Sequence, residues 1–360
     1  MMMPLRTLLT TAVATLGTLV SASAAPPPKP SRSLAPKPPT PSVAEPATAP
    51  AALRDQLRTI TRAFDGSSGI AIVSLRDGWE ASWNGDKLFP QQSCSKLWVA
   101  ITAMDAVDRG RIRLSNKVTL TRDDLTLFHQ PIRQKILTGP YTTTLGALLF
   151  QAVTESDNTA NDRLLRAVGG SEAVRAMIAR KGLGAIRFYE GERKLQSRIA
   201  GLTWQPSYSY GNAFETARAA LPMPVRQAAF DRYLTNPYDG AAPRAVANAL
   251  ARLKAGQLLS PTSTAELLSI MGSTRTGKLR VRAGLAPGWS WNHKTGTGQQ
   301  LGGRIGGIND IGLLTAPDGA IYAMSIMTVP NRADGGAQDL MQAVARAVIA
   351  QHRTRRARQV

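Results

Sequence analysis

Apolar residues recur with helical spacing in the segment that follows the Pro-rich N-terminal region. Leu53, Leu57, Ile60 and Phe64 lie three or four positions apart, which predicts an amphipathic helix. Shorter apolar runs bounded by turn residues predict strands. By these criteria, the expected helices cover residues 51–64, 95–107, 145–153, 159–168, 171–181, 245–255, 260–271 and 337–352. The expected strands cover residues 68–75, 79–88, 289–293, 310–315 and 321–329.

The expected strands lie near both ends of this pattern, and most of the expected helices lie between them. A chain of this order forms one sheet from its two ends, with the intervening helices as an inserted unit. The sequence therefore predicts an α/β (α+β) fold, in which helices flank an antiparallel sheet and an all-helical domain is inserted. The expected boundaries are residues 51–90 and 274–352 for the discontinuous α/β domain and residues 91–273 for the helical domain. A functional site is expected where the two domains meet.

The N-terminal residues have the pattern of an export signal. Arg6 precedes an apolar run over residues 8–20, and Ala22-Ser23-Ala24 fits a cleavage site of small residues. The run is shorter than the ~20 residues that a membrane-spanning helix needs, although an uncleaved anchor is the alternative. Residues 25–50 are rich in Pro, Ala, Ser and Thr, which predicts a disordered linker. We therefore expect a signal peptide over residues 1–24 and a periplasmic or secreted mature protein.

Basic residues greatly outnumber acidic ones. The 360 residues include 44 Lys and Arg against 24 Asp and Glu, which gives a formal net charge of +20 and a pI near 10.9. This charge favours association with anionic envelope surfaces, whereas nucleic acid is not an expected partner because no recognition motif accompanies it. Residues 353–360 form an arginine-rich tail that is expected to be solvated. Cys94 is the only cysteine, which excludes an intramolecular disulfide, and we expect a monomer.

Three short motifs carry the candidate chemistry. In chain order they are Ser93-Cys94-Ser95-Lys96, Ser156-Asp157-Asn158 and Lys294-Thr295-Gly296. The first places a lysine one helical turn from a serine, and a hydroxyl needs such a neighbour to take its proton before it acts as a nucleophile. In a chain of this length a Ser-x-x-Lys pattern is expected about once or twice by chance. The tripeptides Ser-Asp-Asn and Lys-Thr-Gly are each expected only roughly 0.05–0.1 times. All three in this order therefore indicate an acyl-transfer site.

The motifs, their order and the expected layout resemble those of the class A β-lactamases, within the penicillin-recognising serine hydrolases. The resemblance covers residues 51–352. Asn309-Asp310-Ile311-Gly312 resembles the start of the strand that follows the Lys-Thr-Gly strand. Arg280 resembles the substrate-carboxylate arginine of some family members, and Phe128 resembles the aromatic residue that flanks the site entrance.

The family's Ω-loop has the pattern Glu-x-x-Leu-Asn, and its glutamate activates the deacylating water. The matching segment here is Glu192-Arg193-Lys194-Leu195-Gln196, in which Gln196 replaces the asparagine. The family closes this loop by a salt bridge, for which Asp239 is retained here while Glu190 occupies the arginine position. We therefore expect the loop to be closed by a different contact. Because glutamine is one methylene longer than asparagine, we also expect Gln196 to hold the deacylating water in a shifted position. Residues 197–238 are longer than in the family and rich in aromatic residues, which predicts a packed helical extension or a wall for a substrate side chain.

The resemblance implies a role for each matched residue. Ser93 would attack a β-lactam, and Lys96 or a water held by Glu192 would take its proton. Ser156 would bridge Lys96, Ser93 and the leaving nitrogen, and so relay the proton. Glu192 would activate water for deacylation, and the backbone N–H groups of Ser93 and Thr297 would form the oxyanion hole. The implied substrate-binding residues are Asn158, Lys294, Thr295, Gly296, Thr297, Arg280, Phe128 and Gln196. No cofactor or metal is expected, because the chain has three histidines and no paired carboxylate spacing.

Alternatives remain open at this point. A DD-peptidase or penicillin-binding protein acting on peptidoglycan peptides would share the three motifs but lack the Ω-loop glutamate. A non-catalytic cell-wall binding module would use the linker and the basic surface, but the intact Ser93, Lys96 and Ser156 argue against it. Glu192 could also be an ordinary exposed loop acid, and Cys94 fits a small buried side chain better than a thiol nucleophile.

Overall fold

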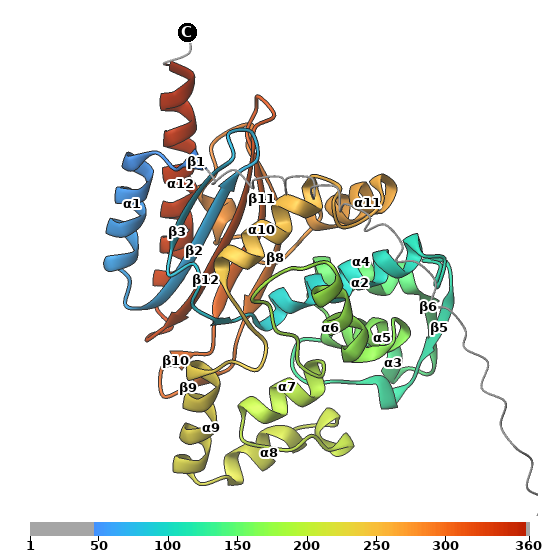
Figure 1. Ribbon diagram of the computed structural model, residues 1–360. Helices are drawn as coiled ribbons and strands as arrows, with labels where there is room; N and C mark the ends of the chain where they lie inside the picture. Colours follow the sequence, from blue (N-terminus) through green and yellow to red (C-terminus); the bar gives the residue numbers. More distant parts are fainter. Residues whose placement is uncertain (1–46, 358–360) are drawn as a thin grey trace, which may run out of the picture. The chain divides into compact units, whose positions relative to one another are not determined.

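The computed structural model describes residues 47–357 (Figure 1). The predicted signal peptide, the linker up to residue 46 and residues 358–360 of the predicted tail lie outside the described residues. In the part of the chain that the structure describes, no helix is both long and apolar enough to cross a membrane.

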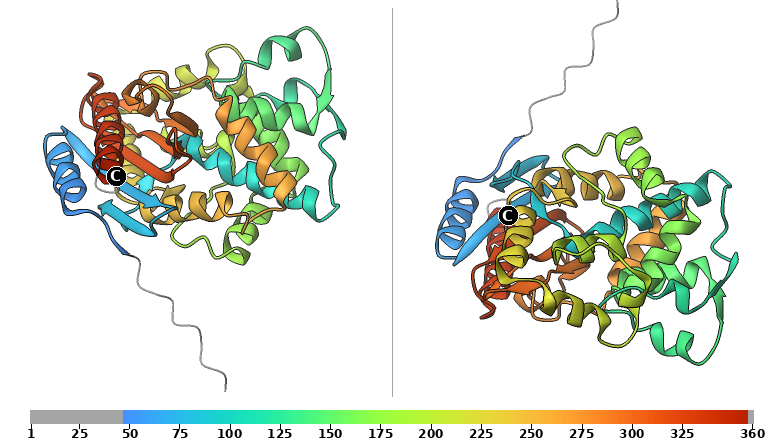
Figure 2. Two further views of the ribbon diagram at one scale, coloured as in Figure 1. Left: turned by 90° about the horizontal axis from the view of Figure 1, so that it is seen from above. Right: turned by 90° about the horizontal axis from the view of Figure 1, so that it is seen from below.

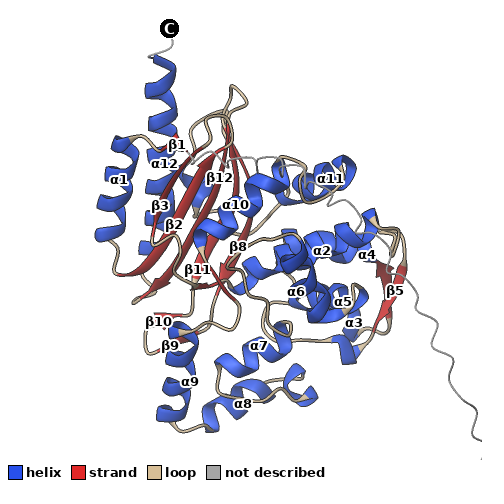
Figure 3. Cartoon of the chain, viewed as in Figure 1, coloured by secondary structure: helices blue, strands red, loops and turns tan. Residues whose placement is uncertain are grey.

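A six-stranded sheet forms the centre of the α/β part and draws its strands from both ends of the chain (Figure 3). Its strands pair in an antiparallel manner, except for the parallel pair β1 and β3. The strand order is β1 (Ala47–Thr48), β3 (Trp79–Trp83), β2 (Gly66–Ser74), β12 (Ile321–Pro330), β11 (Ile308–Thr315) and β8 (Ser290–Thr297). The predicted fold class is therefore confirmed.

Side chains of the central strand β12 alternate between two cores, as the period of a β-strand requires. Met324 and Ile326 belong to the core beneath α1 (Ala51–Arg62) and α12 (Gly336–Ala357), whereas Ala323 and Met327 belong to the core on the other face. Figure 2 shows α1 beside α12 at the edge of the molecule that lies away from the helical part. Each face of the sheet is thus covered, and the sheet is a rigid support for the residues at its end.

The helical part is organised around α2 (Lys96–Asp108), which is buried on nearly all sides. A helix that is apolar all round can be stable only inside a core, and α2 packs against α4, α5, α6 and α11. The other helices are α3 (Arg133–Leu137), α4 (Leu145–Thr154), α5 (Asn158–Ala167), α6 (Gly170–Arg180), α7 (Glu192–Ile199), α8 (Ala213–Ala220), α9 (Met223–Thr235), α10 (Pro243–Lys254) and α11 (Pro261–Gly272). Short turns of 3₁₀-helix are η1 (Gln92–Ser95), η2 (Arg122–Asp124), η3 (Pro206–Ser209) and η4 (Val281–Gly284). Three two-stranded pairs complete the fold: β4 (Phe89–Pro90) with β7 (Gly240–Ala241), β5 (Lys117–Leu120) with β6 (Tyr141–Thr144), and β9 (Gln300–Leu301) with β10 (Arg304–Ile305).

Three predicted boundaries differ from the structure. The linker was expected to run to residue 50, but Ala47–Thr48 pair with β3 and Ala49 is buried. The solvated tail was expected from residue 353, but α12 continues to Ala357, and the guanidinium of Arg355 forms an ion pair with Asp77. Helix α10 falls within the predicted helical domain, yet it packs on β12 and β2 of the sheet. Composition predicted a disordered linker and a solvated tail because it does not register the contacts that these residues make with distant parts of the chain.

Candidate active site

The hydroxyl of Ser93 lies at the start of the buried helix α2, in the 3₁₀ turn η1. The preceding residue, Gln92, has a φ of 53°, a conformation that a non-glycine residue adopts only when its surroundings hold it there. Here the backbone N–H of Gln92 donates to Asp239 at 2.8 Å, and the carbonyl of Gln92 accepts from the Ser95 hydroxyl at 2.7 Å. The turn that presents Ser93 is therefore fixed on both sides of the nucleophile.

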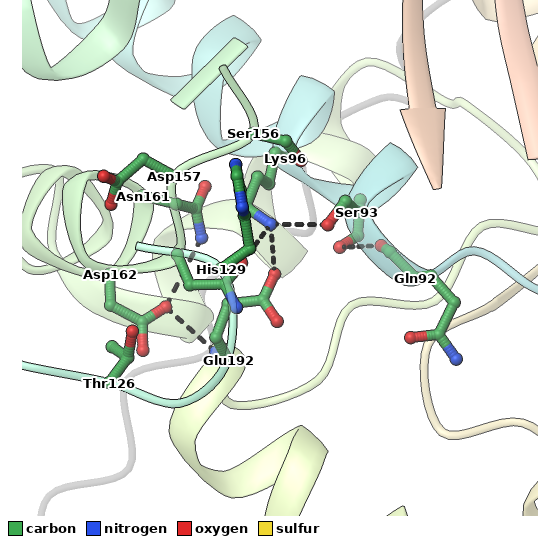
Figure 4. A network of polar contacts seen from close by, with 12 residues as sticks. Gln92, Ser93, Lys96, Thr126, His129, Ser156, Asp157, Asn161, Asp162 and Glu192 are labelled. Carbon is green, nitrogen blue, oxygen red and sulfur yellow. Dashed lines mark hydrogen bonds and ion pairs between the residues drawn. The ribbon is translucent and has the colours of Figure 1, made fainter. Parts of the chain in front are cut away.

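The ammonium of Lys96 joins Ser93 to the Ω-loop (Figure 4). Its Nζ donates to the Ser93 hydroxyl at 2.7 Å, to Oδ1 of Asn158 at 2.8 Å and to Oε1 of Glu192 at 2.6 Å. The side chains of Lys96 and Glu192 are 0% and 3% exposed. A buried charge pair of this kind is stable only when hydrogen bonds occupy the donors and acceptors of both partners. The three acceptors around Lys96 occupy all three N–H groups of its ammonium.

Helix α7 presents Glu192 at its first residue. The backbone N–H of Glu192 donates to the carboxylate of Asp162 at 2.9 Å, and Nε2 of Gln196, one turn later, donates to the second carboxylate oxygen of Glu192 at 3.2 Å. Burial and the charge of Glu192 raise the pKa of Asp162 to about 6. The interpretation of Glu192 as an exposed loop acid is therefore wrong, and the glutamine that replaces asparagine still contacts it.

The Ser156-Asp157-Asn158 segment is held by its middle residue. Asp157 caps α5 by accepting from the backbone N–H of Ala160 at 2.8 Å, and its other oxygen accepts from the N–H of Ile132 at 2.6 Å. Ser156 has a φ of 61°, which turns its hydroxyl toward the sheet. Among the described residues, this hydroxyl accepts from Nζ of Lys294 at 2.8 Å, not from Lys96 as predicted. The structure therefore connects Ser156 directly to Lys294.

Strand β8 brings Lys294 to the site. The side chain is fully buried, and its Nζ also donates to the carbonyl of Thr295 at 2.9 Å. Burial, together with the charges of Lys96 and Arg280, lowers the pKa of Lys294 to about 7. Its ammonium is thus easier to deprotonate than that of a surface lysine.

Glycine is required at position 296 for this strand to approach the nucleophile. A Cβ atom on Gly296 would lie 2.4 Å from the carbonyl oxygen of Gln91, immediately before the η1 turn. Gly296 was predicted to bind substrate, but it does not line the cavity described below. Its role is the close contact of backbone with backbone.

A guanidinium extends the cationic side of the site. Nη1 of Arg280 donates to the carbonyls of Gly296 and Asn309 at 3.0 and 2.6 Å, and Nη2 donates to the Thr297 hydroxyl at 2.5 Å. The hydroxyl groups of Thr276 and Thr295 share a hydrogen bond of 2.6 Å beside it. Burial lowers the pKa of Arg280, which nevertheless remains a fixed positive charge at neutral pH.

These groups meet at a cavity of about 500 Å³, a size that suits a small-molecule substrate. Lys96, Glu192 and Lys294 lie behind its wall because they are buried. The predicted residues that line it are Ser93, Phe128, Ser156, Asn158, Gln196, Arg280, Thr295 and Thr297. The lining residues that the sequence did not reveal are His129, Arg218, Thr276, Gly298, Gln299 and Gln300. Gly298, Gln299 and Gln300 come shortly after the Lys-Thr-Gly motif, and this proximity in the sequence could have identified them as lining residues. Nothing in the sequence around Arg218 indicates that it lies at the cavity.

The Ω-loop is closed without the family's salt bridge, as predicted. Glu190 forms an ion pair with Lys194 on the surface. Asp239 is buried and accepts from the Tyr233 hydroxyl at 2.9 Å and from the Gln92 N–H at 2.8 Å. Because burial outweighs these two hydrogen bonds, the pKa of Asp239 is raised to about 7. A tyrosine from the extension thus replaces the missing arginine.

Cys94 and His293 take no part in the cavity. The thiol of Cys94 is fully buried, and burial raises its pKa to about 12, so it is not a thiolate nucleophile at neutral pH. His293 precedes Lys294 and points to the opposite face, where its Nδ1 contacts Asp310 at 2.7 Å. The expectation of a small buried cysteine is confirmed.

Comparisons with known proteins agree with this geometry. A family model described as "Beta-lactamase enzyme family" matches residues 52–352. The β-lactamase CTX-M-97 of Escherichia coli is 25% identical over 297 residues, which cover 82% of this chain and 88% of the relative. A solved β-lactamase structure from Chitinophaga pinensis is 25% identical with a TM-score of 0.69, and the match covers 83% of this chain and 99% of that one. An ancestral class A β-lactamase structure is 28% identical with a TM-score of 0.67, and the match covers 83% of this chain and 99% of that one.

The family match therefore spans nearly the whole described chain, including all three motifs and the Ω-loop. The solved relatives share the arrangement of sheet and helices along almost their full length. The chain belongs to the beta-lactamase enzyme family and is a class A serine β-lactamase.

Proposed function

We propose that this β-lactamase opens the β-lactam amide through an acyl-enzyme on Ser93 and that Glu192 activates the water that releases the product. The observation that carries the proposal is the position of the Lys96 ammonium, 2.7 Å from the Ser93 hydroxyl and 2.6 Å from the Glu192 carboxylate. Nucleophile, lysine and carboxylate therefore belong to one hydrogen-bonded line, along which a proton can pass in either direction.

In acylation, Lys96 first gives a proton to Glu192 and then takes the proton of the Ser93 hydroxyl as its oxygen attacks the lactam carbonyl. The carbonyl oxygen becomes negative and is stabilised by the backbone N–H groups of Ser93 and Thr297, a contribution of about 10²- to 10³-fold for each donor. The ring C–N bond then breaks, and the nitrogen receives the proton of the Ser156 hydroxyl, which takes a proton in turn from the Lys294 ammonium. Before deacylation Glu192 gives the proton it received to solvent and Lys294 regains one from solvent, so that Glu192 is again a carboxylate and no net proton is gained.

The substrate is oriented by groups on both sides of Ser93. The ring carboxylate is bound by the hydroxyl groups of Thr295 and Thr297, with Lys294 and Arg280 as the charges behind them. Asn158 lines the cavity, and one hydrogen of its Nδ2 donates to the carbonyl of Leu127. The second hydrogen is available for the amide carbonyl of the substrate side chain.

Deacylation uses the same carboxylate. Glu192 removes a proton from water, the resulting hydroxide attacks the Ser93 ester, and the proton returns to Ser93 as the ester bond breaks. Gln196 donates to Glu192 at 3.2 Å and lines the cavity, so it is placed to hold this water. The product is a ring-opened amino acid, and the enzyme is regenerated.

Hydrolysis of nitrocefin, combined with intact-mass analysis, tests the proposal. The wild-type protein should hydrolyse nitrocefin, whereas Ser93→Ala should lose activity by about 10⁴-fold or more, as removal of the nucleophile does in other serine hydrolases. Cys94→Ala is the matched control, because it alters the adjacent buried thiol and should retain activity within about threefold. A Ser93→Ala protein with wild-type turnover would contradict the proposal.

The same experiment separates hydrolysis from stable acylation. A DD-peptidase or penicillin-binding protein would show a persistent penicillin adduct on the wild-type protein and no turnover. The direct contact of buried Glu192 with Lys96 supports release of the adduct instead. A wild-type adduct that persists for hours would therefore contradict the deacylation step.

We also propose that the chain is exported and that its positive charge associates it with anionic envelope surfaces. The net charge of +20 and the N-terminal pattern support both statements. The mature protein in a periplasmic or secreted fraction should begin at Ala25 by mass spectrometry. A protein that retains residues 1–24 in that fraction would contradict cleavage at this site.

A further inference from the structure

Helix α8 of the extension contributes a charged residue to the catalytic cavity. Arg218 lines the same cavity as Ser93 and Asn158. Its Nη2 donates to the carbonyl of Gln300 at 2.8 Å, and Gln300 begins β9, three residues after β8 ends. In Figure 1, α8 lies with α7 and α9, below the sheet and the helical part in this view. The extension is therefore connected to the segment that directly follows the strand with the Lys-Thr-Gly motif.

The positive charge of Arg218 is incompletely balanced. Among the described residues, its ion-pair partner is Glu215, whose carboxylate lies 3.9 Å away and whose side chain is 57% exposed. That distance is too long for a hydrogen bond. Arg226 adds a second positive charge nearby, and its buried Nε has no hydrogen-bond partner among the described residues. The side chain of Arg218 is only 17% exposed, and its guanidinium has N–H donors available for an anionic group that enters the cavity.

An aromatic surface lies beside this charge. Phe128 is 44% exposed at the cavity and packs edge-to-face on Phe214, with ring centroids 5.3 Å apart. Phe214 lies four residues before Arg218 on α8, so both project from one face of the helix. Tyr208 and Trp204 support Phe214 from behind. We call Arg218, Phe214 and Phe128 the extension wall.

The two cations of the cavity are held by different elements of the fold. Arg280 is fixed by Thr297 and by the carbonyls of Gly296 and Asn309, next to the motif strand, and serves that carboxylate in the proposed function. Arg218 comes from a different element and is held by Gln300. It is therefore free to bind a second anionic group of the same substrate.

We propose that the extension wall is a side-chain subsite, in which Arg218 selects β-lactams whose acyl side chain carries a carboxylate next to an aromatic ring. The inference rests on the proposed function, because it concerns the substrate of the same Ser93 reaction. Phe128 would contact the ring, and Arg218 would pair with the carboxylate in a partly desolvated position, where a charge-assisted hydrogen bond is strongest.

Three penicillins that differ in one group test this subsite. Benzylpenicillin has a neutral side chain, carbenicillin adds an α-carboxylate to it, and ampicillin adds an α-ammonium. Arg218→Gln should lower the ratio of kcat/KM for carbenicillin to that for benzylpenicillin by about tenfold, the change that one lost charge-assisted hydrogen bond gives. The same variant should raise kcat/KM for ampicillin about two- to threefold, because a repulsion is removed.

Arg232→Gln is the matched control. It removes the same charge from an exposed position on α9 of the same extension, outside the cavity lining. The control should leave the ratio of kcat/KM for carbenicillin to that for benzylpenicillin unchanged. Arg218→Lys, which keeps the positive charge, should retain part of the wild-type preference for carbenicillin. An unchanged ratio in Arg218→Gln, or an equal loss in Arg232→Gln, would overturn the subsite. Failure of the wild type to hydrolyse benzylpenicillin would instead refute the proposed function, and with it the subsite, so that the two failures are distinguishable.

Discussion

The catalytic cavity has two walls that differ in burial and in the way their charges are balanced. The motif wall consists of Ser93 and Ser156, with Lys96, Glu192 and Lys294 buried behind them. The extension wall consists of Arg218, Phe214 and Phe128. Arg218 and Phe128 line the cavity and are partly exposed, whereas Phe214 is buried and supports Phe128. In the motif wall every charge contacts a partner at hydrogen-bond distance, whereas Arg218 has a carboxylate only at 3.9 Å.

This difference fits the roles that we propose for the two walls. Proton transfer to and from Ser93 requires fixed distances and the exclusion of water, which strengthens each electrostatic interaction. Selection of a side chain requires only charge and shape, and a cation with no carboxylate at hydrogen-bond distance serves it better than one whose donors are all used. We therefore expect substitutions in the motif wall to affect kcat for every β-lactam, and substitutions in the extension wall to change the ranking of substrates.

The largest effect is expected for Glu192→Gln, which breaks the charge pair of the motif wall while keeping its shape. An amide cannot accept a proton from Lys96 or from water, so kcat should fall by about 10²- to 10⁴-fold, the usual contribution of general base catalysis. Intact-mass analysis during turnover of benzylpenicillin should detect an accumulated Ser93 adduct. Glu190→Gln, two residues away on the surface, is the control and should have wild-type kinetics. Turnover by Glu192→Gln at the wild-type rate would show that another base acts.

A smaller effect is expected from the titration of Lys294. Its pKa of about 7 in the free enzyme means that the ammonium loses its proton as the pH rises from 7 to 9. Since the charged form binds the ring carboxylate, kcat/KM should decline by up to about tenfold for each pH unit above this pKa. The kcat should change less, because a bound carboxylate keeps the lysine protonated.

The pH profile of Lys294→Arg identifies the group that titrates. Arginine remains charged over the whole range, so the alkaline decline in kcat/KM should disappear. Thermal unfolding measured alongside shows whether the larger side chain is accommodated. If a folded Lys294→Arg protein shows the same decline in kcat/KM at alkaline pH, the decline is due to the titration of another residue.

A third effect concerns Asp239, which lies where the extension meets the nucleophile turn. Its folded-state pKa of about 7 lies above the ordinary value of 3.8, so its contribution to stability is fully present below about pH 4 and is lost as the pH rises through 7. The Tm of the wild type should therefore decrease more between pH 5 and pH 8 than the Tm of Asp239→Asn, which has no such titration. Asp162 also titrates in this range but is present in both proteins, so it cancels in the difference. If the Tm values of the two proteins depend equally on pH between pH 5 and pH 8, Asp239 is ionised over this whole range.

The motif wall could be predicted from the sequence, and the extension wall could not. Ser93 and Lys96 are one helical turn apart on a helix whose apolar residues are evident, so their contact follows from local geometry. The absence of an arginine at Glu190 predicted a different closure of the Ω-loop. It could not predict Tyr233 as the replacement, because that contact depends on how α9 packs. Arg218 belongs to no motif, and its position in the cavity depends on the tertiary path of residues 197–238.

The smallest expected effect, that of Phe214→Leu, sharpens the comparison most directly. The substitution removes the edge-to-face contacts with Phe128 and Tyr208, each typically worth about 0.5–1.5 kcal/mol, but leaves the apolar volume nearly filled. The Tm should fall by a few degrees, and KM for benzylpenicillin should rise about two- to fivefold, because Phe128 loses its support. The kcat should stay within about twofold, since no residue of the motif wall contacts Phe214 through a ring or hydrogen bond in the described part of the chain. Tyr210→Leu, an exposed aromatic residue of the same extension, is the control and should change neither KM nor kcat. A fall in kcat with unchanged KM would mean that the extension supports the catalytic geometry itself, and the division of labour between the two walls would not hold.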